Sequence, residues 1–343
     1  MSPPILHVSN LKKHYSLPGG FFGQPRLVRA VDDLSFEIAR GETLALVGES
    51  GCGKSTVGKA VLRLFDITSG QISLDGRRID ELSDGGLRPL RRRMQVVFQD
   101  PFSSLNPRLS VREVIAEPLR NFRLASPGPE MDRKVEEILD RVRLPHDAAG
   151  RLPHEFSGGQ RQRIGIARAL APNPDLIVCD EAVSALDVSV KAQIVNLLKD
   201  VQKELGLALL FISHDLAIVE NISHRIAVMY LGKIVEMAPK RSLFAGPRHP
   251  YTQALLSAVP IPEPGVRRDR ILLRGDLPSP ISPPPGCRFH TRCPYVFDRC
   301  RTEEPELRNV GAAHTAACHL DALPKPASES AIREKARRDA LSE

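Results

Sequence analysis

The fold class follows from one glycine-rich stretch: Gly48, Glu49, Ser50, Gly51, Cys52, Gly53, Lys54, Ser55 and Thr56. An apolar run over 43–47 precedes it and reads as a buried strand, and residues 57–64 read as the first turns of a helix. Glycines at such a junction let successive backbone N–H groups point at one anion, and the helix start adds its positive dipole end. Strand, loop and helix together predict a phosphate-binding loop, the alternative being a glycine-rich turn with a chance lysine.

Two side chains of this loop add chemistry to the backbone cradle. Lys54 can reach the β- and γ-phosphates of a bound nucleotide, and the Ser55 hydroxyl can complete a Mg²⁺ shell that otherwise keeps water. We therefore expect the chain to bind a nucleoside triphosphate together with Mg²⁺.

Length and composition set the broad class of the protein. The chain has 343 residues, 42% of them hydrophobic, and a net charge of +7. These values favour two domains, or one large domain with an appendage. No run approaches the ~18 apolar residues of a membrane helix, and the N-terminus lacks the layout of a signal peptide, so a cytoplasmic location is expected. The basic residues are scattered without interleaved aromatic residues, and we expect no nucleic acid partner.

Strand-like and helix-like patterns surround the phosphate loop. Residues 5–8, 27–31 and 34–38 alternate apolar and polar positions and predict an antiparallel β layer. Tyr15 follows the first of these strands; such an aromatic residue is either filler or a face that stacks on a base. Residues 110–150 have helical spacing and predict a helical insertion.

Polar residues stand where three further strands end. Asp180 and Glu181 follow a buried strand, and His214 follows another. We expect Asp180 to be a Mg²⁺ partner, Glu181 to polarise water and His214 to hydrogen-bond the γ-phosphate. Gln99, at a third strand end, is expected to face the metal and the attacking water. The alternative for Asp180 and Glu181 is a solvated strand end that bears two acids, and the alternative for His214 is a structural histidine.

A second helix start is also suited to phosphate. Ser157 is placed to cap a helix, and Gly158 and Gly159 before Gln160 allow close approach to an anion. Two phosphate-facing helix starts in one chain indicate a composite site.

These segments, in this order, resemble the ATP-binding subunit of an ABC transporter over roughly residues 5–260. Residues 48–56 match the Walker A motif, Gln99 the Q-loop glutamine and 156–160 the signature, in which Phe156 replaces the usual leucine. Asp180 matches the end of Walker B and Glu181 the catalytic glutamate, while 184–187, ending in Asp187, match the D-loop and His214 the switch histidine. Tyr15 matches the aromatic residue that stacks on adenine. The resemblance implies an ATP hydrolase in which Lys54, Gln99, Glu181 and His214 act on ATP, and Ser55, Gln99 and Asp180 hold Mg²⁺.

Further residues narrow the resemblance to the peptide-type importers, which carry di- and oligopeptides and have relatives for nickel and some sugars. Phe98–Pro101, Ser103–Arg108 and His249–Leu256 are typical of them. The resemblance implies a head-to-tail heterodimer with a second, paralogous ATPase, two transmembrane permease subunits and, indirectly, an extracytoplasmic solute-binding protein. The chain would lie peripherally on the cytoplasmic face of the inner membrane. The alternative is a soluble ABC ATPase that acts on nucleic acid or the ribosome.

Four cysteines gather near the C-terminus: Cys287, Cys293, Cys300 and Cys318. Clustered thiols in a cytoplasmic protein suggest metal, although the close thiol pairs of common zinc modules are missing. Four thiolates suit a [4Fe–4S] cluster, which peptide-type ATPases can carry in this region. Nearby histidines, His290, His314 and His319, keep zinc as the alternative, and free thiols are the third possibility. Cys52 and Cys179 are expected to pack rather than to bind metal.

The expected fold is therefore an α/β P-loop NTPase core with an antiparallel β layer and a helical subdomain at about 100–170. We expect the nucleotide-binding domain to span 1–258. A Pro- and Cys-rich extension over 259–323, pinned by its metal, and a charged, flexible tail over 324–343 would follow.

Overall fold

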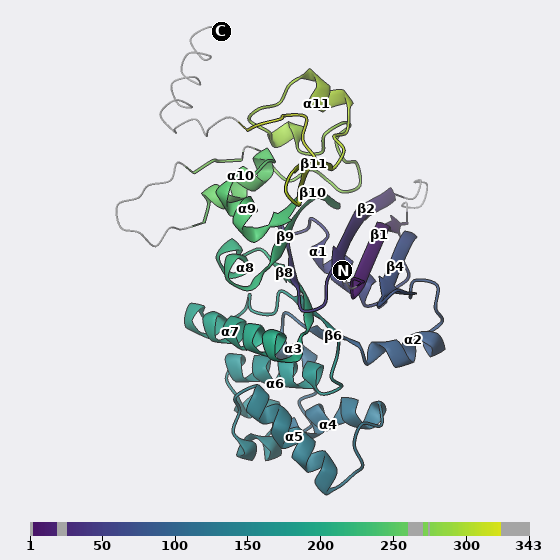
Figure 1. The fold of residues 1–343 in the computed structure, drawn as a ribbon, viewed down its shortest axis with the longest axis vertical. Helices are drawn as coiled ribbons and strands as arrows, with labels where there is room; N and C mark the ends of the chain where they lie inside the picture. The colour runs from purple at the N-terminus through teal and green to yellow at the C-terminus, as the bar shows by residue number, and fades with distance from the viewer. Residues whose placement is uncertain (1–2, 19–25, 260–269, 274, 324–343) are drawn as a thin grey trace.

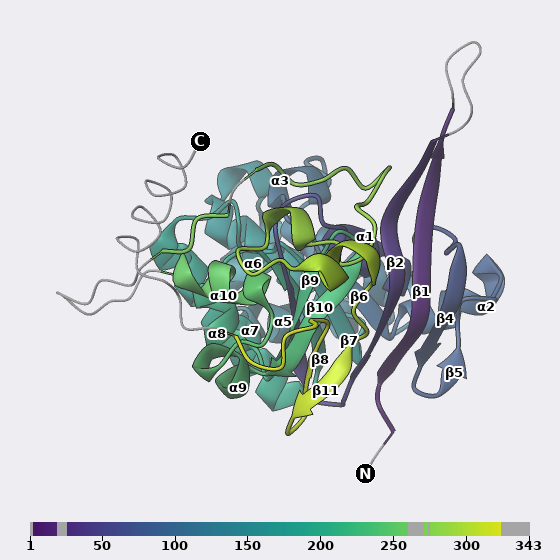
Figure 2. The ribbon, with the colours of Figure 1, turned by 90° about the horizontal axis from the view of Figure 1, so that it is seen from above.

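The computed structural model of the chain describes residues 3–18, 26–259, 270–273 and 275–323. They form two β-sheets with helices packed around them (Figures 1 and 2). The expected mixed α/β architecture with an antiparallel β layer is confirmed. The charged tail over 324–343 lies outside the described residues, and the domain boundaries at 258 and 323 stay predictions.

The larger sheet has eight strands and carries the phosphate loop at its centre. Its spatial order is β11 (Arg308–Gly311), β12 (His314–Ala316), β10 (Lys233–Pro239), β9 (Arg225–Tyr230), β3 (Thr43–Val47), β8 (Ala208–Ser213), β7 (Leu176–Asp180) and β6 (Met94–Val97). The strands from β9 to β6 are parallel, and β10, β12 and β11 continue the sheet in antiparallel pairs. All five residues of β3 are buried, as expected for a parallel strand covered on both faces.

The smaller sheet is antiparallel, in the order β2 (Arg26–Ile38), β1 (Leu6–Leu17), β4 (Ser69–Leu74) and β5 (Arg77–Arg78). The two strands expected over 27–31 and 34–38 are in fact one continuous strand, β2. Within β2, Asp33 has a left-handed φ of 67°, a local irregularity of the strand. It interrupts the alternation of apolar and polar residues, which is why the sequence pattern predicted two strands. Tyr15 lies within β1 and not after it.

Helices cover the sheets and form a separate layer at one end of the molecule (Figure 1). Helix α1 (Lys54–Val61) begins at the phosphate loop and packs between the two sheets. The expected helical insertion is found as α3 (Pro101–Ser104), α4 (Val111–Asn121), α5 (Pro129–Arg141) and α6 (Gly158–Leu170). The other α-helices of the described residues are α2 (Asp84–Arg91), α7 (Val188–Leu205), α8 (Leu216–Ile222), α9 (Lys240–Ala245), α10 (Pro250–Ser257) and α11 (Asp298–Thr302). None of the helices in the described ranges is long and apolar enough to cross a membrane.

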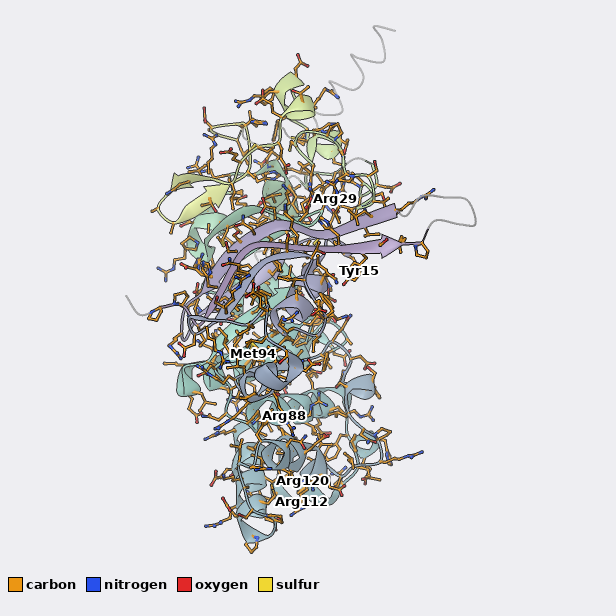
Figure 3. All side chains as sticks on the ribbon, turned by 90° about the vertical axis from the view of Figure 1, so that its right-hand side faces the viewer. Tyr15, Arg29, Arg88, Met94, Arg112 and Arg120 are labelled. Atoms are coloured by element: carbon orange, nitrogen blue, oxygen red, sulfur yellow. The ribbon has the colours of Figure 1, made fainter. Side chains whose placement is uncertain are left out.

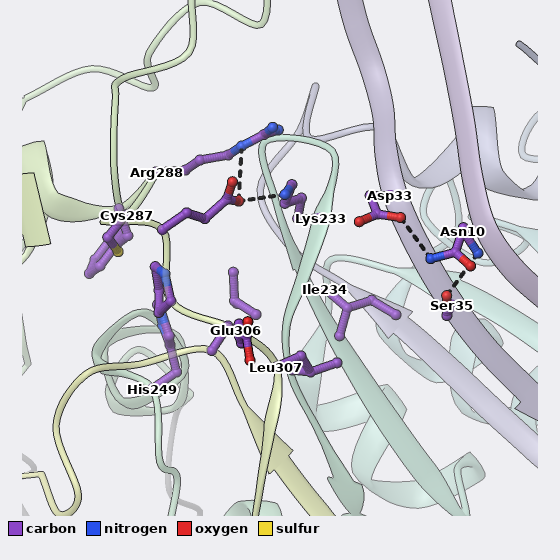
Figure 4. Close-up of a pocket in the computed structure, with 15 residues that line it drawn as sticks. Asn10, Asp33, Ser35, Lys233, Ile234, His249, Cys287, Arg288, Glu306 and Leu307 are labelled. Carbon is purple, nitrogen blue, oxygen red and sulfur yellow. Dashed lines mark hydrogen bonds and ion pairs between the residues drawn. The ribbon is translucent and has the colours of Figure 1, made fainter. Parts of the chain in front are cut away.

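The C-terminal segment is built into the main fold. Strand β12 pairs with β10, with Ala316 opposite Glu236, and so extends the larger sheet. The Phe289 ring is 1% exposed and packs in the main core. A cavity of about 510 Å³ separates this segment from the antiparallel layer, with Arg288 on one wall and Asp33 on the other (Figure 4).

One buried ion pair fastens the C-terminal segment to the antiparallel layer. The Arg288 guanidinium donates to the Asp32 carboxylate on β2 and to the Leu231 carbonyl in the β9–β10 turn. Both side chains of the ion pair are about nine-tenths buried. Burial alone would raise the pKa of Asp32, but the hydrogen bonds from Arg288 and His14 outweigh it and lower the pKa below its ordinary value of 3.8.

Replacing Arg288 by alanine should therefore destabilise the chain. We expect Arg288→Ala to lower the free energy of unfolding by about 3–5 kcal/mol, because it leaves a buried carboxylate without its main partner. Urea unfolding of the full chain at pH 7 measures this loss. The control is Arg143→Ala, which removes an exposed ion pair with Asp200 and should cost about 1 kcal/mol or less.

The difference in free energy of unfolding between wild type and Arg288→Ala should depend on pH. The carboxylate of Asp32 stabilises the fold fully above its unfolded pKa, near 3.8, and this contribution disappears as pH falls through the lower folded value. The difference between wild type and Arg288→Ala should shrink over that range. If Arg288→Ala lowers the free energy of unfolding at pH 7 no more than Arg143→Ala does, the stabilising role of the Arg288–Asp32 ion pair is contradicted.

Candidate nucleotide site

The phosphate loop lies against two neighbouring segments so closely that two of its glycines leave no room for a side chain. A Cβ at Gly48 would stand 2.2 Å from the Met229 carbonyl oxygen, and one at Gly53 would stand 2.1 Å from that of Ala30. Gly53 also has a φ of 107°, in the left-handed region that favours glycine. Strands β9 and β2 therefore set the path of the loop, and α1 begins directly after Gly53.

Lys54 stands at the centre of this loop. Its Nζ donates to the carbonyl oxygens of Gly48 at 2.8 Å and Glu49 at 2.9 Å, and the residue is 4% exposed. The loop backbone is thus wrapped around a buried ammonium group, the arrangement expected for a group that meets phosphate. Ser50 and Gly51 form the outer turn of the loop, where both are exposed.

The two residues expected to hold Mg²⁺ at the loop are in contact. The Ser55 hydroxyl donates to Asp180 Oδ1 at 2.8 Å. Burial raises the pKa of Asp180, and the hydrogen bond from Ser55 partly opposes it. A hydroxyl and a carboxylate oxygen are suitable Mg²⁺ ligands, so the donor set fits the ion. Thr56 follows in the first turn of α1 and is half-buried.

Glu181 and His214 lie together at the adjoining strand ends. His214 Nδ1 and Glu181 Oε1 are 3.4 Å apart, and the Glu181 backbone N–H donates to the Ile212 carbonyl. Glu181 has a left-handed φ of 49°, a strained backbone of the kind that gathers at functional sites. Its carboxylate is largely buried while His214 is more than half exposed. This pair can orient and polarise a water molecule.

Gln99 and Tyr15 approach the site from separate elements. Gln99 is exposed two residues beyond the end of β6, which pairs with β7 through Val97 and Cys179, so it stands at the same sheet edge as Asp180. Tyr15 projects from β1, 38% exposed and edge-on to Phe65 at 6.1 Å (Figure 3). Its ring is therefore accessible for stacking on a base.

The second predicted helix start, residues 157–160, belongs to the helical layer and not to the surroundings of the loop (Figure 1). Ser157 caps α6 in a reciprocal capping box with Gln160. A Cβ at Gly159 would stand 2.4 Å from Val190 Cγ1, so the glycine is required by packing against α7. Ser157, Gln160 and the nearby Asp187, which precedes α7, are exposed. One chain thus presents two separate halves of a nucleotide site.

Two contacts of the loop were not anticipated from the sequence. Arg292 binds the Glu49 carboxylate with two hydrogen bonds, of 2.7 and 3.1 Å, and the Tyr251 hydroxyl accepts from the Glu49 backbone N–H at 2.8 Å. In the sequence, Tyr251 stood out only as part of the run 249–256, and Arg292 only as the residue before Cys293. Neither position indicated a contact with the phosphate loop.

The four C-terminal cysteines, far apart in sequence, meet in space. Cys287, Cys293, Cys300 and Cys318 line one small cavity of about 10 Å³, with His290 and His319 nearby. Burial raises the pKa of Cys287 to about 11 and that of Cys293 to about 12, which favours the neutral thiols over the thiolates. Across the part of the chain that the structure describes, no group of three or more His, Cys, Asp or Glu side chains could hold a metal ion. The expectation of metal ligands therefore has no support in this geometry.

Comparison with family models divides the chain into two matched parts. Residues 31–184 match the ABC transporter model, which includes the phosphate loop, Gln99, the signature and Glu181. Residues 235–300 match the model of the oligopeptide/dipeptide transporter C-terminal region.

Curated relatives match nearly the whole chain. A probable peptide ABC transporter ATP-binding protein, y4tS of Sinorhizobium fredii, is 54% identical over 94% of this chain and 91% of its own length. The oligopeptide transport ATP-binding protein AppF of Bacillus subtilis is 52% identical over 92% of this chain and 97% of its own.

Solved structures share the nucleotide-binding part of the fold. The dimeric, post-hydrolysis ATP-binding cassette MJ0796 bound to ADP and Pi has a TM-score of 0.62 and 30% identity, over 69% of this chain and 99% of that one. CbiO1 of Clostridium perfringens, part of the cbiONQ transporter complex, has a TM-score of 0.60 at 30% identity. The match covers 71% of this chain and 91% of that one. The chain belongs to the family of ABC transporter ATP-binding proteins, in the branch named for peptide and oligopeptide transport.

Proposed function

We propose that the chain is the ATP-hydrolysing subunit of an ABC importer and powers the uptake of di- or oligopeptides across the cytoplasmic membrane. One observation carries the catalytic part: Lys54, Ser55, Asp180, Glu181 and His214 come from three separate segments and meet at one edge of the larger sheet. The peptide substrate is supported by the names of the relatives and by the match of the C-terminal region.

Each residue would act on ATP in a defined way. Lys54 and the loop N–H groups bind the β- and γ-phosphates and take up the negative charge that develops there. Ser55, Asp180 and Gln99 would hold Mg²⁺, which neutralises phosphate charge when bound. Glu181 accepts a hydrogen bond from the attacking water, and His214, 3.4 Å away, can hydrogen-bond the γ-phosphate. Tyr15 would stack on the adenine ring.

The missing half of each site would come from a second ATPase. Ser157 and Gln160 are exposed and lie in the helical layer, away from the loop of their own chain. A head-to-tail dimer would bring this helix start and Asp187 to the partner's nucleotide. We propose that the partner is a paralogous chain, which makes a heterodimer, with both subunits on the cytoplasmic face of the inner membrane.

Two exposed aromatic residues suit contact with membrane subunits. Phe98 is 37% and Phe102 64% exposed on either side of Gln99, the residue expected to face the metal and the attacking water. Two permease subunits that dock here would be coupled to the state of the nucleotide, and a solute-binding protein outside the membrane would deliver the cargo. A soluble role on nucleic acid or the ribosome has only the charge of +7 in its favour.

For the C-terminal thiols we propose a structural metal, either a [4Fe–4S] cluster or zinc, bound by Cys287, Cys293, Cys300 and Cys318. Four thiols on one cavity are the donor set that both groups use. The cavity has room for about one water molecule, so a four-iron cluster requires the thiols to lie further apart than they do here. The metal would fasten a proline-rich segment that has no core of its own.

The hydrolytic role of Glu181 is tested by Glu181→Gln. The variant should bind ATP as wild type does and lose roughly 10²–10⁴-fold in turnover, because the amide cannot accept the proton of the attacking water. ATP binding and phosphate release by the assembled transporter measure the two effects. The matched control is Glu204→Gln, an exposed position at the end of α7, which should leave turnover unchanged. Wild-type turnover in Glu181→Gln would refute the assignment.

The metal proposal is tested by Cys293→Ser in chain purified without oxygen. Iron, sulfide and zinc analysis should find one metal type in wild type and its loss in the variant, while ATP binding is retained. Cys179→Ala, in a strand remote from the cavity, is the control and should keep its metal. Metal-free wild type, or a metal content unaffected by Cys293→Ser, would leave these residues as free thiols.

The assembly is tested by gentle detergent extraction from membranes and identification of the co-purified chains. We expect one paralogous ATPase and two integral membrane proteins, together with peptide-stimulated ATP hydrolysis in the presence of the solute-binding protein. Recovery of two copies of this chain would contradict the heterodimer. Recovery with ribosomes or nucleic acid alone would contradict the transport function.

A further inference from the structure

The contact between Arg292 and Glu49 joins the C-terminal segment directly to the phosphate loop. Arg292 ends a short 3-10 helix over His290–Arg292, and its side chain is 9% exposed against 28% for Glu49. The two terminal guanidinium nitrogens, Nη1 and Nη2, each donate to one carboxylate oxygen, the bidentate geometry in which arginine is not replaceable by lysine. Residues 243 positions apart are therefore held in one fixed arrangement at the nucleotide site.

Aromatic packing fixes Arg292 relative to the loop. Phe289, three residues earlier, lies edge-on to Tyr230 at 5.3 Å and tilted against Tyr251 at 5.4 Å, and all three rings are buried. The Tyr251 hydroxyl accepts from the Glu49 backbone N–H. Glu49 is thus held at its backbone by Tyr251 and at its side chain by Arg292.

The charge of Glu49 makes this contact relevant to nucleotide binding. The Glu49 carbonyl oxygen accepts from Lys54 Nζ at 2.9 Å. The Glu49 carboxylate is therefore carried by a residue that contacts the phosphate-binding lysine. A free carboxylate at this position would repel a triphosphate, more strongly than it repels a diphosphate. The Arg292 guanidinium is a permanent cation, and its bidentate contact therefore neutralises the Glu49 carboxylate.

We propose that Arg292 is a positioning residue of the nucleotide site. Its ion pair with Glu49 holds the first turn of the phosphate loop and neutralises the carboxylate beside Lys54, so that the C-terminal segment sets the affinity for ATP. The inference rests on the nucleotide site described above, and it does not depend on which substrate is transported or whether a metal is bound.

The central test is the nucleotide affinity of Arg292→Ala. We expect the full chain to bind the fluorescent analogue TNP-ATP roughly tenfold more weakly, a change typical of coupled sites, and displacement by ATP to be weakened more than displacement by ADP. In the assembled transporter the KM for ATP should rise while kcat is largely retained, since Arg292 is not among the groups placed on the reacting atoms. High salt should reduce the difference.

A double variant separates charge from folding. Arg292→Ala combined with Glu49→Gln removes the carboxylate as well and should recover most of the lost affinity, which a loss of folding could not do. Arg292→Lys keeps the charge without the bidentate fork and should lie between wild type and Arg292→Ala; it serves as the test if Arg292→Ala does not fold. The control is Arg299→Ala, which removes an exposed ion pair with Glu303 in the same segment.

The outcomes are distinct. Wild-type affinity in Arg292→Ala overturns the proposal, and so does a double variant that binds as weakly as Arg292→Ala alone. An equal loss in Arg299→Ala would assign the effect to the segment as a whole and also overturns it. Failure of the wild-type chain to bind TNP-ATP would instead contradict the nucleotide site itself.

Discussion

The phosphate loop packs so closely against its neighbours that it couples the two sheets of the fold. Gly48 and Gly53 lie so near the carbonyl oxygens of Met229 and Ala30 that a single added carbon would not fit. The loop can therefore form only where β9 and β2 are already correctly packed, and these strands belong to different sheets. Binding of phosphate by the backbone is thus a property of both sheets together, although the motif itself occupies nine consecutive residues.

The parallel strands bring residues from separate parts of the sequence together in one site. Carboxyl ends of parallel strands meet at one edge of a sheet, so β3, β7 and β8 deliver Lys54, Asp180 and Glu181, and His214 to the same place. The same architecture places the start of α6 elsewhere, in the helical layer. A single chain consequently has the groups that bind and hydrolyse a nucleotide but not the second helix start beside them, which agrees with the proposed dimer.

The C-terminal segment is better described as part of the nucleotide-binding fold than as an appendage. It adds β12 to the edge of the larger sheet, inserts Phe289 into the core, and reaches both β2 and the phosphate loop through Arg288 and Arg292. Its four thiols share a cavity, but their arrangement lacks metal-binding geometry. The stability of the segment, as the structure shows it, comes from these contacts with the main body.

The parts that depend on local spacing could be predicted from the sequence: the strand–loop–helix unit around residues 48–56, the capped helix start at Ser157, the acids at the end of β7 and the histidine after β8. Each follows from backbone preferences over a dozen residues or fewer, which a sequence pattern records directly. Three features became visible only in the folded chain: β2 is one strand, β12 joins the larger sheet and Glu49 is paired with Arg292. Such pairings join residues as many as 243 positions apart, and packing of the whole chain selects them from many arginines and glutamates of equal local character.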